Sequence, residues 1–359
     1  MRVGVPAETH PGERRVALVP DAIPRLTEAG LDVAVEAGAG RTAFALDDAY
    51  RAAGATVVSD VLADSDVVLS VAPLTTAQVG RLRPGTITIS FLPAGQTELV
   101  NRLTDHQVTA FAMELVPRIS RAQSMDALSS QALVAGYRCA LVAAQRLPRF
   151  FPLFMTAAGT VAPAKVLVLG AGVAGLQAIA TARRLGAVVQ AYDVRPASAD
   201  EVRSMGATFV TLDLAALEGA GGYAREMTED RAQRQRELLT PYLADSDAVI
   251  TTAAVPGKAA PLLITADMVA AMRPGSVVVD LAAESGGNCE LSRPGEDVEH
   301  QGVLVWGAKD VASSMPVHAS QLYARNVSNL LLLMTHEGEV VPDFDDEIVA
   351  AACVTGRPG

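Results

Sequence analysis

The stretch VLVLGAGVAGLQAIATARRLGAVVQAYD, residues 166–193, decides the fold of this chain. Four apolar residues precede the glycine pattern Gly170, Gly172 and Gly175, and a helical pattern follows it. A second apolar run then ends at Asp193, 23 residues after Gly170. This order of strand, GxGxxG turn, helix and strand with a terminal acid is typical of a dinucleotide-binding βαβ unit.

Each glycine of the turn has a separate expected role. Gly170 permits the tight turn, Gly172 lets the backbone approach a pyrophosphate, and Gly175 lets the helix pack closely on the strand. The phosphates would lie at the helix N-terminus, on free N–H groups and the positive end of the dipole. The alternative is a glycine-rich turn without a ligand.

The residues after the second strand bear on the choice of nucleotide. Asp193 would accept hydrogen bonds from the adenosine ribose, and its carboxylate would repel a 2′-phosphate. Arg195, two residues later, could instead accept that phosphate. The charge on Asp193 favours NAD(H) over NADP(H).

Apolar runs of strand length recur along the whole chain. They lie at residues 3–8, 67–72, 86–91 and 108–113, and then at 165–170, 188–193, 248–253, 276–281 and 303–307. Continuous apolar runs that alternate with helical patterns are typical of parallel sheets covered on both faces. The segment LADSD occurs at 62–66 and 243–247, and Arg-Pro-Gly at 83–85 and 273–275, each before a strand. Chance in an Ala- and Val-rich chain is the alternative to a structural repeat.

These patterns predict an α/β fold of two doubly wound, Rossmann-like parallel-sheet domains joined by long helices, with a cleft between them. The first domain would comprise residues 1–127 and 315–359, and the nucleotide-binding domain residues 128–314. The linking helices are expected at 128–146 and 321–334, and a further amphipathic helix at 20–29. The cleft is the default place for a ligand.

Composition excludes several other classes of protein. Half of the 359 residues are hydrophobic, which excludes intrinsic disorder, and the net charge of −11 argues against nucleic acid or an anionic membrane as partner. Cys139, Cys289 and Cys353 are far apart, which favours a reducing compartment over a disulfide framework or a zinc cluster. The uncharged stretch 166–182 fits a buried strand, turn and helix better than a membrane span, so no transmembrane helix or signal peptide is expected.

Two further segments carry concentrated polar chemistry. The loop PRISRAQSMDALSSQ, residues 117–131, contains a cation, an amide, a carboxylate and several hydroxyls. Its acid or a serine could simply cap the helix that follows. The segment GGYAREM, residues 221–227, suggests a mobile flap with an apolar tip, or else a plain surface loop.

These two segments and the glycine turn resemble the soluble NAD(H)-binding component, α1, of the proton-translocating NAD(P) transhydrogenases. Segments 251–265 and 280–292 are also similar to it, and the resemblance runs from residue 3 to residue 355. It implies direct, Si-face/Re-face-specific hydride transfer from NADH to NADP+ on a partner subunit, with no acid, base or metal at the reacting carbons. It further implies a homodimer that is cytoplasmic and peripheral on the inner face of the membrane, through NADP(H)-binding and membrane-spanning subunits.

The resemblance also assigns individual residues. In the family the polar loop binds the nicotinamide half of the nucleotide, and the matching positions here are Arg118, Gln123, Asp126 and Ser129. Positions on the adenosine side or near the flap match Val173, Asp193, Gly222, Tyr223 and Gln235, and Ala254 matches a backbone position beside the cofactor. The family often has leucine at the position of Ala254, so the side chain there has no assigned role.

Two other functions fit some of the pattern. Alanine dehydrogenase shares the opening segment, including Glu8 and Arg15, but the resemblance to that enzyme would require a lysine and a histidine near the substrate. The corresponding segments here, LSVAPL at 69–74 and ISFLPAG at 89–95, contain neither. A module that only senses NADH would explain the glycine turn but not the polar loop.

Overall fold

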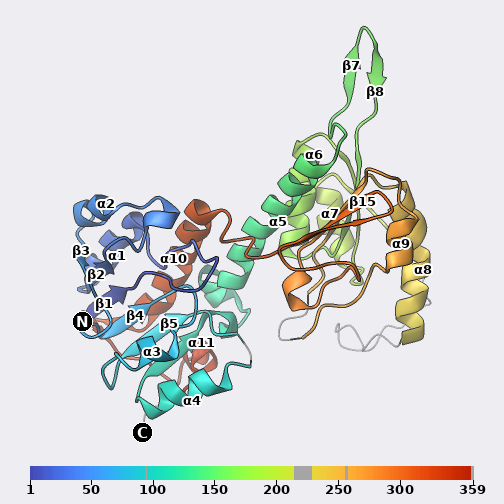
Figure 1. Cartoon of the computed structure of the whole chain (residues 1–359). Coiled ribbons are helices and arrows are strands. Elements are labelled where there is room, and N and C mark those ends of the chain that lie inside the picture. Colours follow the sequence, from blue (N-terminus) through green and yellow to red (C-terminus); the bar gives the residue numbers. More distant parts are fainter. Residues whose placement is uncertain (94, 214–228, 255–257, 357–359) are drawn as a thin grey trace. The chain divides into compact units, whose positions relative to one another are not determined.

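The computed structural model describes residues 1–93, 95–213, 229–254 and 258–356, which form two compact units (Figure 1). Unit 1 comprises Met1–Gln131 and Ala312–Gly359, and unit 2 comprises Ala132–Val311. Helix α5, Ala127–Arg146, begins in unit 1 and continues into unit 2. Each unit is built around its own parallel sheet and its own hydrophobic core.

Unit 1 contains a six-stranded parallel sheet in the order β3-β2-β1-β4-β5-β6. Its strands are β1 Arg2–Val5, β2 Asp32–Glu36, β3 Thr56–Val58, β4 Val67–Leu69, β5 Ile87–Ser90 and β6 Thr109–Ala112. The chain passes from β1 outward to β3, then returns to β4 on the other side of β1. This doubly wound order places a topological switch point between β1 and β4, where such sheets bind ligands.

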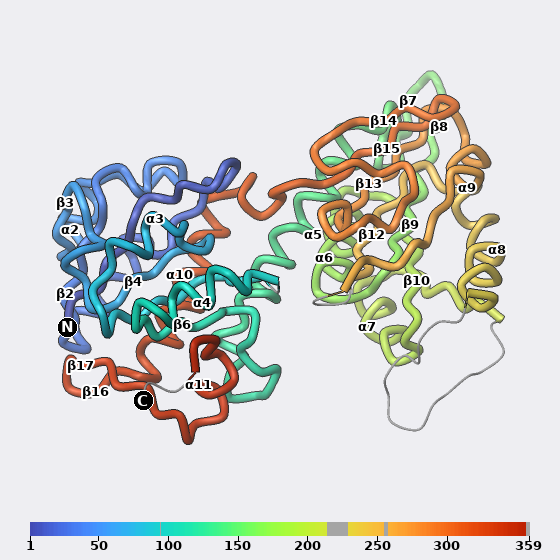
Figure 2. Tube along the Cα trace, turned by 60° about the horizontal axis from the view of Figure 1, so that its bottom comes forward, coloured from blue at the N-terminus to red at the C-terminus, as the bar shows by residue number. Residues whose placement is uncertain are grey.

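Helices cover both faces of this sheet. They are α1 Ile23–Glu28, α2 Asp47–Ala52, α3 Thr76–Val79, α4 Thr97–Asp105, α10 Pro316–Leu333 and α11 Glu347–Ala352, with 3-10 turns η1 Pro20–Ala22, η2 Arg41–Ala43, η3 Met113–Leu115 and η4 Ser120–Met125. One core joins the sheet to α1 and α10, and a second joins its other face to α3 and α4. The hairpin β16 Thr335–His336 with β17 Glu339–Val340 lies beside the N-terminus, where Met1 N donates to Gly338 O at 2.8 Å (Figure 2).

Unit 2 contains a seven-stranded sheet in the order β11-β10-β9-β12-β13-β15-β14. Its strands are β9 Lys165–Leu169, β10 Val188–Tyr192, β11 Thr208–Phe209, β12 Ala248–Thr251, β13 Val277–Asp280, β14 Asp297–His300 and β15 Val303–Gly307. All neighbours are parallel except β14, which pairs antiparallel with β15 at the edge. The switch point therefore lies between β9 and β12.

Alternate residues of β9 and β12 face two different helix layers in unit 2. Val166, Val168 and Ile250 pack with helices α5, α6 Val173–Arg184 and α7 Ser198–Ser204. Leu167 and Val249 pack with α8 Glu229–Asp245 and α9 Ala266–Ala270 on the other face, and η5 spans Ala283–Ser285. A separate hairpin, β7 Phe154–Thr156 with β8 Gly159–Val161, projects from unit 2 (Figure 1).

The repeated sequence segments form equivalent contacts at the amino ends of the strands. In unit 1, Asp66 accepts from Arg2 N at 2.7 Å and pairs with Arg83 at 2.9 Å. In unit 2, Asp247 accepts from Lys165 N at 2.9 Å and pairs with Arg273 at 3.4 Å. In each unit the aspartate thus ties the start of the first strand to the Arg-Pro-Gly turn before the fifth.

The predicted fold class, two Rossmann-like parallel sheets in an α/β chain, is confirmed. One detail differs, because strand β14 makes the sheet of unit 2 mixed rather than wholly parallel. The stretch 166–182 is strand β9, the glycine turn and helix α6, as expected. Within the described residues, one helix, α5, is long and apolar enough to cross a membrane, and half of its most apolar window is buried in the protein.

Candidate functional site

The glycine turn between β9 and α6 has one open position between two packed ones. Gly170 has φ +101°, and a Cβ there would lie 2.9 Å from Thr252 Oγ1. A Cβ on Gly175 would collide with the carbonyl oxygen of Gly170, so this glycine is required for close packing. A Cβ on Gly172 would meet nothing within 4 Å. The open space beside Gly172 is what the approach of a pyrophosphate requires.

The first turn of α6 faces this space with its backbone N–H groups. Gly172 is the N-cap residue, and no side chain caps the helix. Val173 is 42% exposed, so the start of this twelve-residue helix is accessible. Helix α5 approaches the same turn closely, since a Cβ on Gly136 would collide with the carbonyl of Ala174. The residues present therefore fit an anionic group of a dinucleotide.

Asp193 lies beside the glycine turn, one residue beyond the end of β10. Its Oδ2 accepts from Ala171 N at 2.7 Å, and its Oδ1 accepts from Arg195 N at 2.8 Å and from Arg195 Nε at 3.0 Å. The Asp193 side chain is only 7% exposed, whereas that of Arg195 is 55% exposed. The hydrogen bonds that Arg195 donates to Asp193, together with the charge of that carboxylate, raise the pKa of Arg195. The carboxylate thus orders the turn and holds the arginine at its side.

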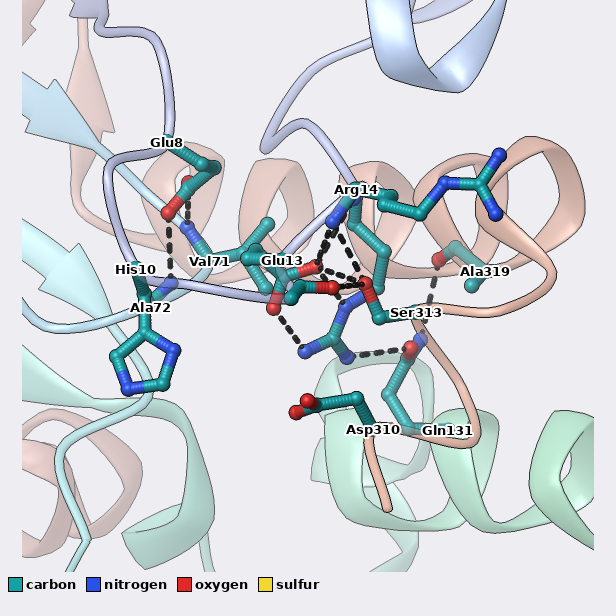
Figure 3. Close-up of polar contacts among 12 residues, drawn as sticks. Glu8, His10, Glu13, Arg14, Val71, Ala72, Gln131, Asp310, Ser313 and Ala319 are labelled. Atoms are coloured by element: carbon teal, nitrogen blue, oxygen red, sulfur yellow. Dashed lines mark hydrogen bonds and ion pairs between the residues drawn. The ribbon is translucent and has the colours of Figure 1, made fainter. Parts of the chain in front are cut away.

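The carboxyl edge of the sheet in unit 1 is organised differently. Glu8 follows β1 and accepts from Val71 N at 2.6 Å and from Ala72 N at 3.1 Å, just past β4 (Figure 3). Glu36 at the end of β2 accepts from Ala7 N at 3.0 Å, and Glu114 after β6 accepts from Leu92 N through both oxygens. Glutamates of unit 1 therefore occupy backbone N–H groups at the edge where unit 2 presents its glycine turn.

Arg15 lies in the same region of unit 1 and is bound to its own neighbours. Its Nε and Nη2 donate to the two oxygens of Glu13 at 2.8 and 2.6 Å, and its Nη1 donates to Gln131 at 2.9 Å. Ser313 also donates to Glu13, and Gln131 donates to Ala319 O (Figure 3). Burial would raise the pKa of Glu13, but its bonds to Arg15 outweigh burial and lower it. The arginine is held in an internal ion pair.

Glu8 has the opposite balance. Burial raises the pKa of Glu8 to about 7, against the lowering effect of its two backbone hydrogen bonds. The nearby charge of Glu13 adds to the increase, and that of Arg15 reduces it. This carboxyl therefore exchanges a proton near neutral pH.

The polar loop forms η4 and the start of α5 in unit 1. Arg118 and Gln123 are exposed. Asp126 caps α5, because its Oδ1 accepts from Ser129 N at 2.8 Å and its Oδ2 accepts from Ser129 Oγ at 2.6 Å. Asn326 of α10 donates to Ser124 O at 2.9 Å and anchors the turn. The capping alternative is thus correct for Asp126, and it does not preclude a ligand on the exposed side chains.

The remaining predicted residues differ in their surroundings. Gln235 on α8 is 1% exposed, and neither polar atom of its amide has a hydrogen-bond partner among the described residues. Ala254 follows β12 and is exposed. Gly222 and Tyr223 lie outside the described residues. The glycine turn, Asp193 and Arg195 lie together in unit 2, whereas Arg118, Gln123, Asp126 and Ser129 belong to unit 1.

The sequence patterns gave no role to Thr252, which the structure places against the glycine turn. Its Oγ1 donates to Gly170 O at 3.1 Å, and its N–H donates to Leu169 O at 2.8 Å. The available signal was its position directly after the buried strand β12, next to β9 in the sheet. The carboxyl ends of adjacent parallel strands meet at one edge, so a hydroxyl there is a candidate contact.

Comparison with known sequences identifies the class of protein. The family model described as "Alanine dehydrogenase/PNT, N-terminal domain" matches residues 4–135, and "Alanine dehydrogenase/PNT, C-terminal domain" matches residues 139–357. The chain therefore belongs to the alanine dehydrogenase/PNT family.

Within this family, the chain is similar to transhydrogenase alpha subunits. It is 48% identical to the first of the polypeptides that make up NAD(P) transhydrogenase subunit alpha in Rhodospirillum rubrum, over 99% of this chain and 96% of that protein. It is 45% identical to NAD(P) transhydrogenase subunit alpha of Haemophilus influenzae, over 99% of this chain and 70% of that protein. A transhydrogenase structure from Sinorhizobium meliloti is 42% identical, covers 98% of each chain and has a TM-score of 0.90.

Alanine dehydrogenases are similar at lower identity. The enzyme of Mycobacterium tuberculosis is 36% identical, over 82% of this chain and 76% of that protein. A solved L-alanine dehydrogenase is 27% identical with a TM-score of 0.83, over 98% of this chain and 94% of that one. The expected resemblance to the transhydrogenase branch of the family is thus confirmed.

Proposed function

We propose that this chain is the NAD(H)-binding component of a proton-translocating NAD(P) transhydrogenase and that it passes hydride directly from NADH to NADP+ on a partner subunit. The observation that carries the proposal is the uncapped start of α6 beside the open Gly172, with Asp193 next to it, in a chain similar to transhydrogenase alpha subunits. Nicotinamide would supply the hydride. The protein then has to bind, orient and exclude water.

The nucleotide would be held from its phosphate and adenosine side by unit 2. The N–H groups of the first turn of α6 would bind the pyrophosphate, with Gly170, Gly172 and Gly175 shaping the turn. Asp193 disfavours a 2′-phosphate by its charge, and this supports NAD(H) rather than NADP(H) as the nucleotide. Arg195 already pairs with Asp193, so some of that charge is compensated. Val173 and Gln235 would complete the adenosine side.

The polar loop would act on the nicotinamide side. Asp126 and Ser129 form a preorganised acceptor and hydroxyl pair at the start of α5. Arg118 and Gln123 are exposed and would orient the carboxamide of the ring, and Ala254 would contribute backbone. None of these groups needs to transfer a proton, because a hydride passes between two carbon atoms. The flap residues Gly222 and Tyr223 would close over the nucleotide.

We further propose a homodimer, located in the cytoplasm at the inner face of the membrane through NADP(H)-binding and membrane-spanning partner subunits. The hairpin β7–β8 supports self-association, since it is exposed along both strands and carries Met155 at 77% and Phe154 at 43% exposure. Apolar arms of this kind mark interaction sites. Met155→Asp should shift the chain from dimer to monomer in sedimentation velocity, and a wild-type monomer would refute the proposed dimer.

Stopped-flow transfer tests the main proposal. Reduction of an NADP+ analogue by NADH should require both this chain and an NADP-binding component. The reaction should proceed without added metal and should carry the deuterium of a 4-deuterated NADH into the product. Product that lacks the label, or transfer that the chain does not accelerate, would refute direct transfer.

A further inference from the structure

The main chain after β12 forms a second wall of the glycine turn in unit 2. Thr252 bonds to both Leu169 O and Gly170 O. The next residue is equally close, since a Cβ on Gly170 would lie 3.0 Å from Ala253 N. The position of residues 252–253 therefore determines the space available around the turn.

The side chain of Asn288 holds this wall. Its Oδ1 accepts from Ala253 N at 3.1 Å, and its Nδ2 donates to Ala253 O at 2.8 Å and to Pro261 O at 2.8 Å. One amide thus pairs with Ala253 in both directions, as a neighbouring strand would, and also binds Pro261. Asn288 is fully buried, so water does not compete for these bonds.

Asn288 is itself fixed by its backbone. Its N–H donates to Asp280 Oδ2 at 2.9 Å, and its carbonyl accepts from Leu263 N and Ile264 N. Asp280, also fully buried, further accepts from Cys289 N, Ala282 N and Thr251 Oγ1. A continuous set of hydrogen bonds therefore runs from the end of β13 through Asn288 to the wall beside Gly170.

We infer that Asn288 is a positioning residue of the nucleotide site, which sets the main chain at 252–253 against the glycine turn; the inference rests on the proposed binding of NAD(H) by unit 2. Only a primary amide supplies the required pattern of one acceptor and two donors at this length. A carboxylate at this position would face two carbonyl oxygens. An alanine would leave a buried N–H and two carbonyls without their partner, a costly arrangement.

The test compares NADH affinity by fluorescence titration in the wild type, Asn288→Ala and Asn288→Asp. We expect both variants to fold, by circular dichroism, and to bind NADH about tenfold or more weakly at pH 8. Ser276→Ala is the matched control, because Ser276 is a buried hydroxyl bonded to Ser246 O at the opposite edge of the same sheet. It should change the melting temperature without changing NADH affinity.

The pH dependence separates positioning from general destabilisation. In Asn288→Asp, protonation at lower pH converts one oxygen to a donor, which restores a bond to one carbonyl while the other oxygen still accepts from Ala253 N. Affinity relative to the wild type should therefore recover between pH 8 and pH 5, and Asn288→Ala should show no recovery. Normal NADH binding by Asn288→Ala, or no recovery in Asn288→Asp, overturns the inference alone. Failure of the wild type to bind NADH overturns the proposed function and the inference together.

Discussion

The carboxylate of Asp193 accepts a hydrogen bond of 2.7 Å from the backbone N–H of Ala171, in the middle of the glycine turn. In unit 1, Glu36 bonds to Ala7 in the equivalent way, from the end of the second strand to the residues after the first. The two units therefore share this brace. In unit 1, Glu8 adds a further carboxylate past the first strand, whereas in unit 2 the helix N-terminus remains uncapped. This difference favours unit 2 as the place for an anionic nucleotide.

Substitution of Asp193 should weaken the preference for NADH over NADPH. Asp193→Asn keeps an acceptor for Ala171 N but removes the charge, so we expect the preference to fall about tenfold, since charge-assisted bonds contribute about 1.5–3 kcal/mol. Asp193→Ala should in addition weaken NADH binding, because it removes the brace of the turn. Nucleotide fluorescence titration measures both effects. Asp200→Asn, an exposed acid paired with Arg203, is the control. Equal affinity of the wild type for both nucleotides would contradict the assignment.

Gln235 provides a second test with two opposite outcomes. Its amide is buried without a partner among the described residues, so Gln235→Leu should stabilise the nucleotide-free chain by about 1 kcal/mol. The same change should weaken NADH binding if the amide is kept for the ligand. Thermal unfolding and NADH titration measure the two quantities. Gln233→Leu, on the exposed side of the same helix, should alter neither. A loss of both stability and affinity would indicate a purely structural glutamine.

Glu8 should make stability depend on pH near neutrality. Its pKa is raised to about 7 in the folded chain from an ordinary value of 4.5, so the folded state binds the proton more tightly than the unfolded state. The stabilisation is complete below about pH 4.5 and is lost as the pH rises to about 7, with a slope of at most about 1.4 kcal/mol per pH unit. Glu8→Gln should remove this contribution. Urea unfolding at several pH values should therefore show a difference between wild type and variant that grows from pH 4.5 to pH 7, and a constant difference would contradict the raised pKa.

The chain should not oxidise alanine. Arg15 is committed to Glu13 and Gln131, and the segments 69–74 and 89–95 contain no lysine or histidine to exchange a proton with an amine. Incubation with NAD+ and L-alanine should produce no NADH above an enzyme-free blank, even though the same sample binds NADH. Steady NADH production would rank the alanine dehydrogenase interpretation above the transhydrogenase one.

The sequence alone predicted the central strands better than the edges of the sheets. Strands such as Val67–Leu69 and Val277–Asp280 are buried on both faces, so they appear as continuous apolar runs. The edge strands Thr56–Val58 and Thr208–Phe209 are short and partly exposed, and they leave no such pattern. The hairpin β7–β8 was also missed, because its exposed strands lack an apolar face to bury.

The site shows a similar limit. Spacing alone located Gly170, Gly172, Gly175 and Asp193, because local chain geometry dictates those positions. The partners of Asp193 and the amide contacts of Asn288 depend on which loops meet at the edge of the sheet. Asn288 lies 35 residues from Ala253 in sequence, so no local pattern could join them. The same holds for the environment that raises the pKa of Glu8.

The last prediction concerns Gln123, which is exposed on η4 between Arg118 and the Asp126–Ser129 pair. An amide can donate and accept at once without adding charge to the path of a hydride. Gln123→Asn keeps that chemistry and shortens the side chain by one methylene. If Gln123 orients nicotinamide, single-turnover transfer should slow roughly a hundredfold, because small misplacements cost about that much.

NADH affinity in this variant should change little, since the phosphate and ribose contacts belong to unit 2. Arg121→Ala is the matched control on the same short helix, because Arg121 pairs with Asp346 of the C-terminal segment and should leave transfer unchanged. Measurement of both quantities with the NADP-binding partner distinguishes orientation from affinity. A weaker affinity with normal transfer would place Gln123 among the binding contacts, and no change in either would remove it from the site, because an exposed amide without a ligand contributes to neither step.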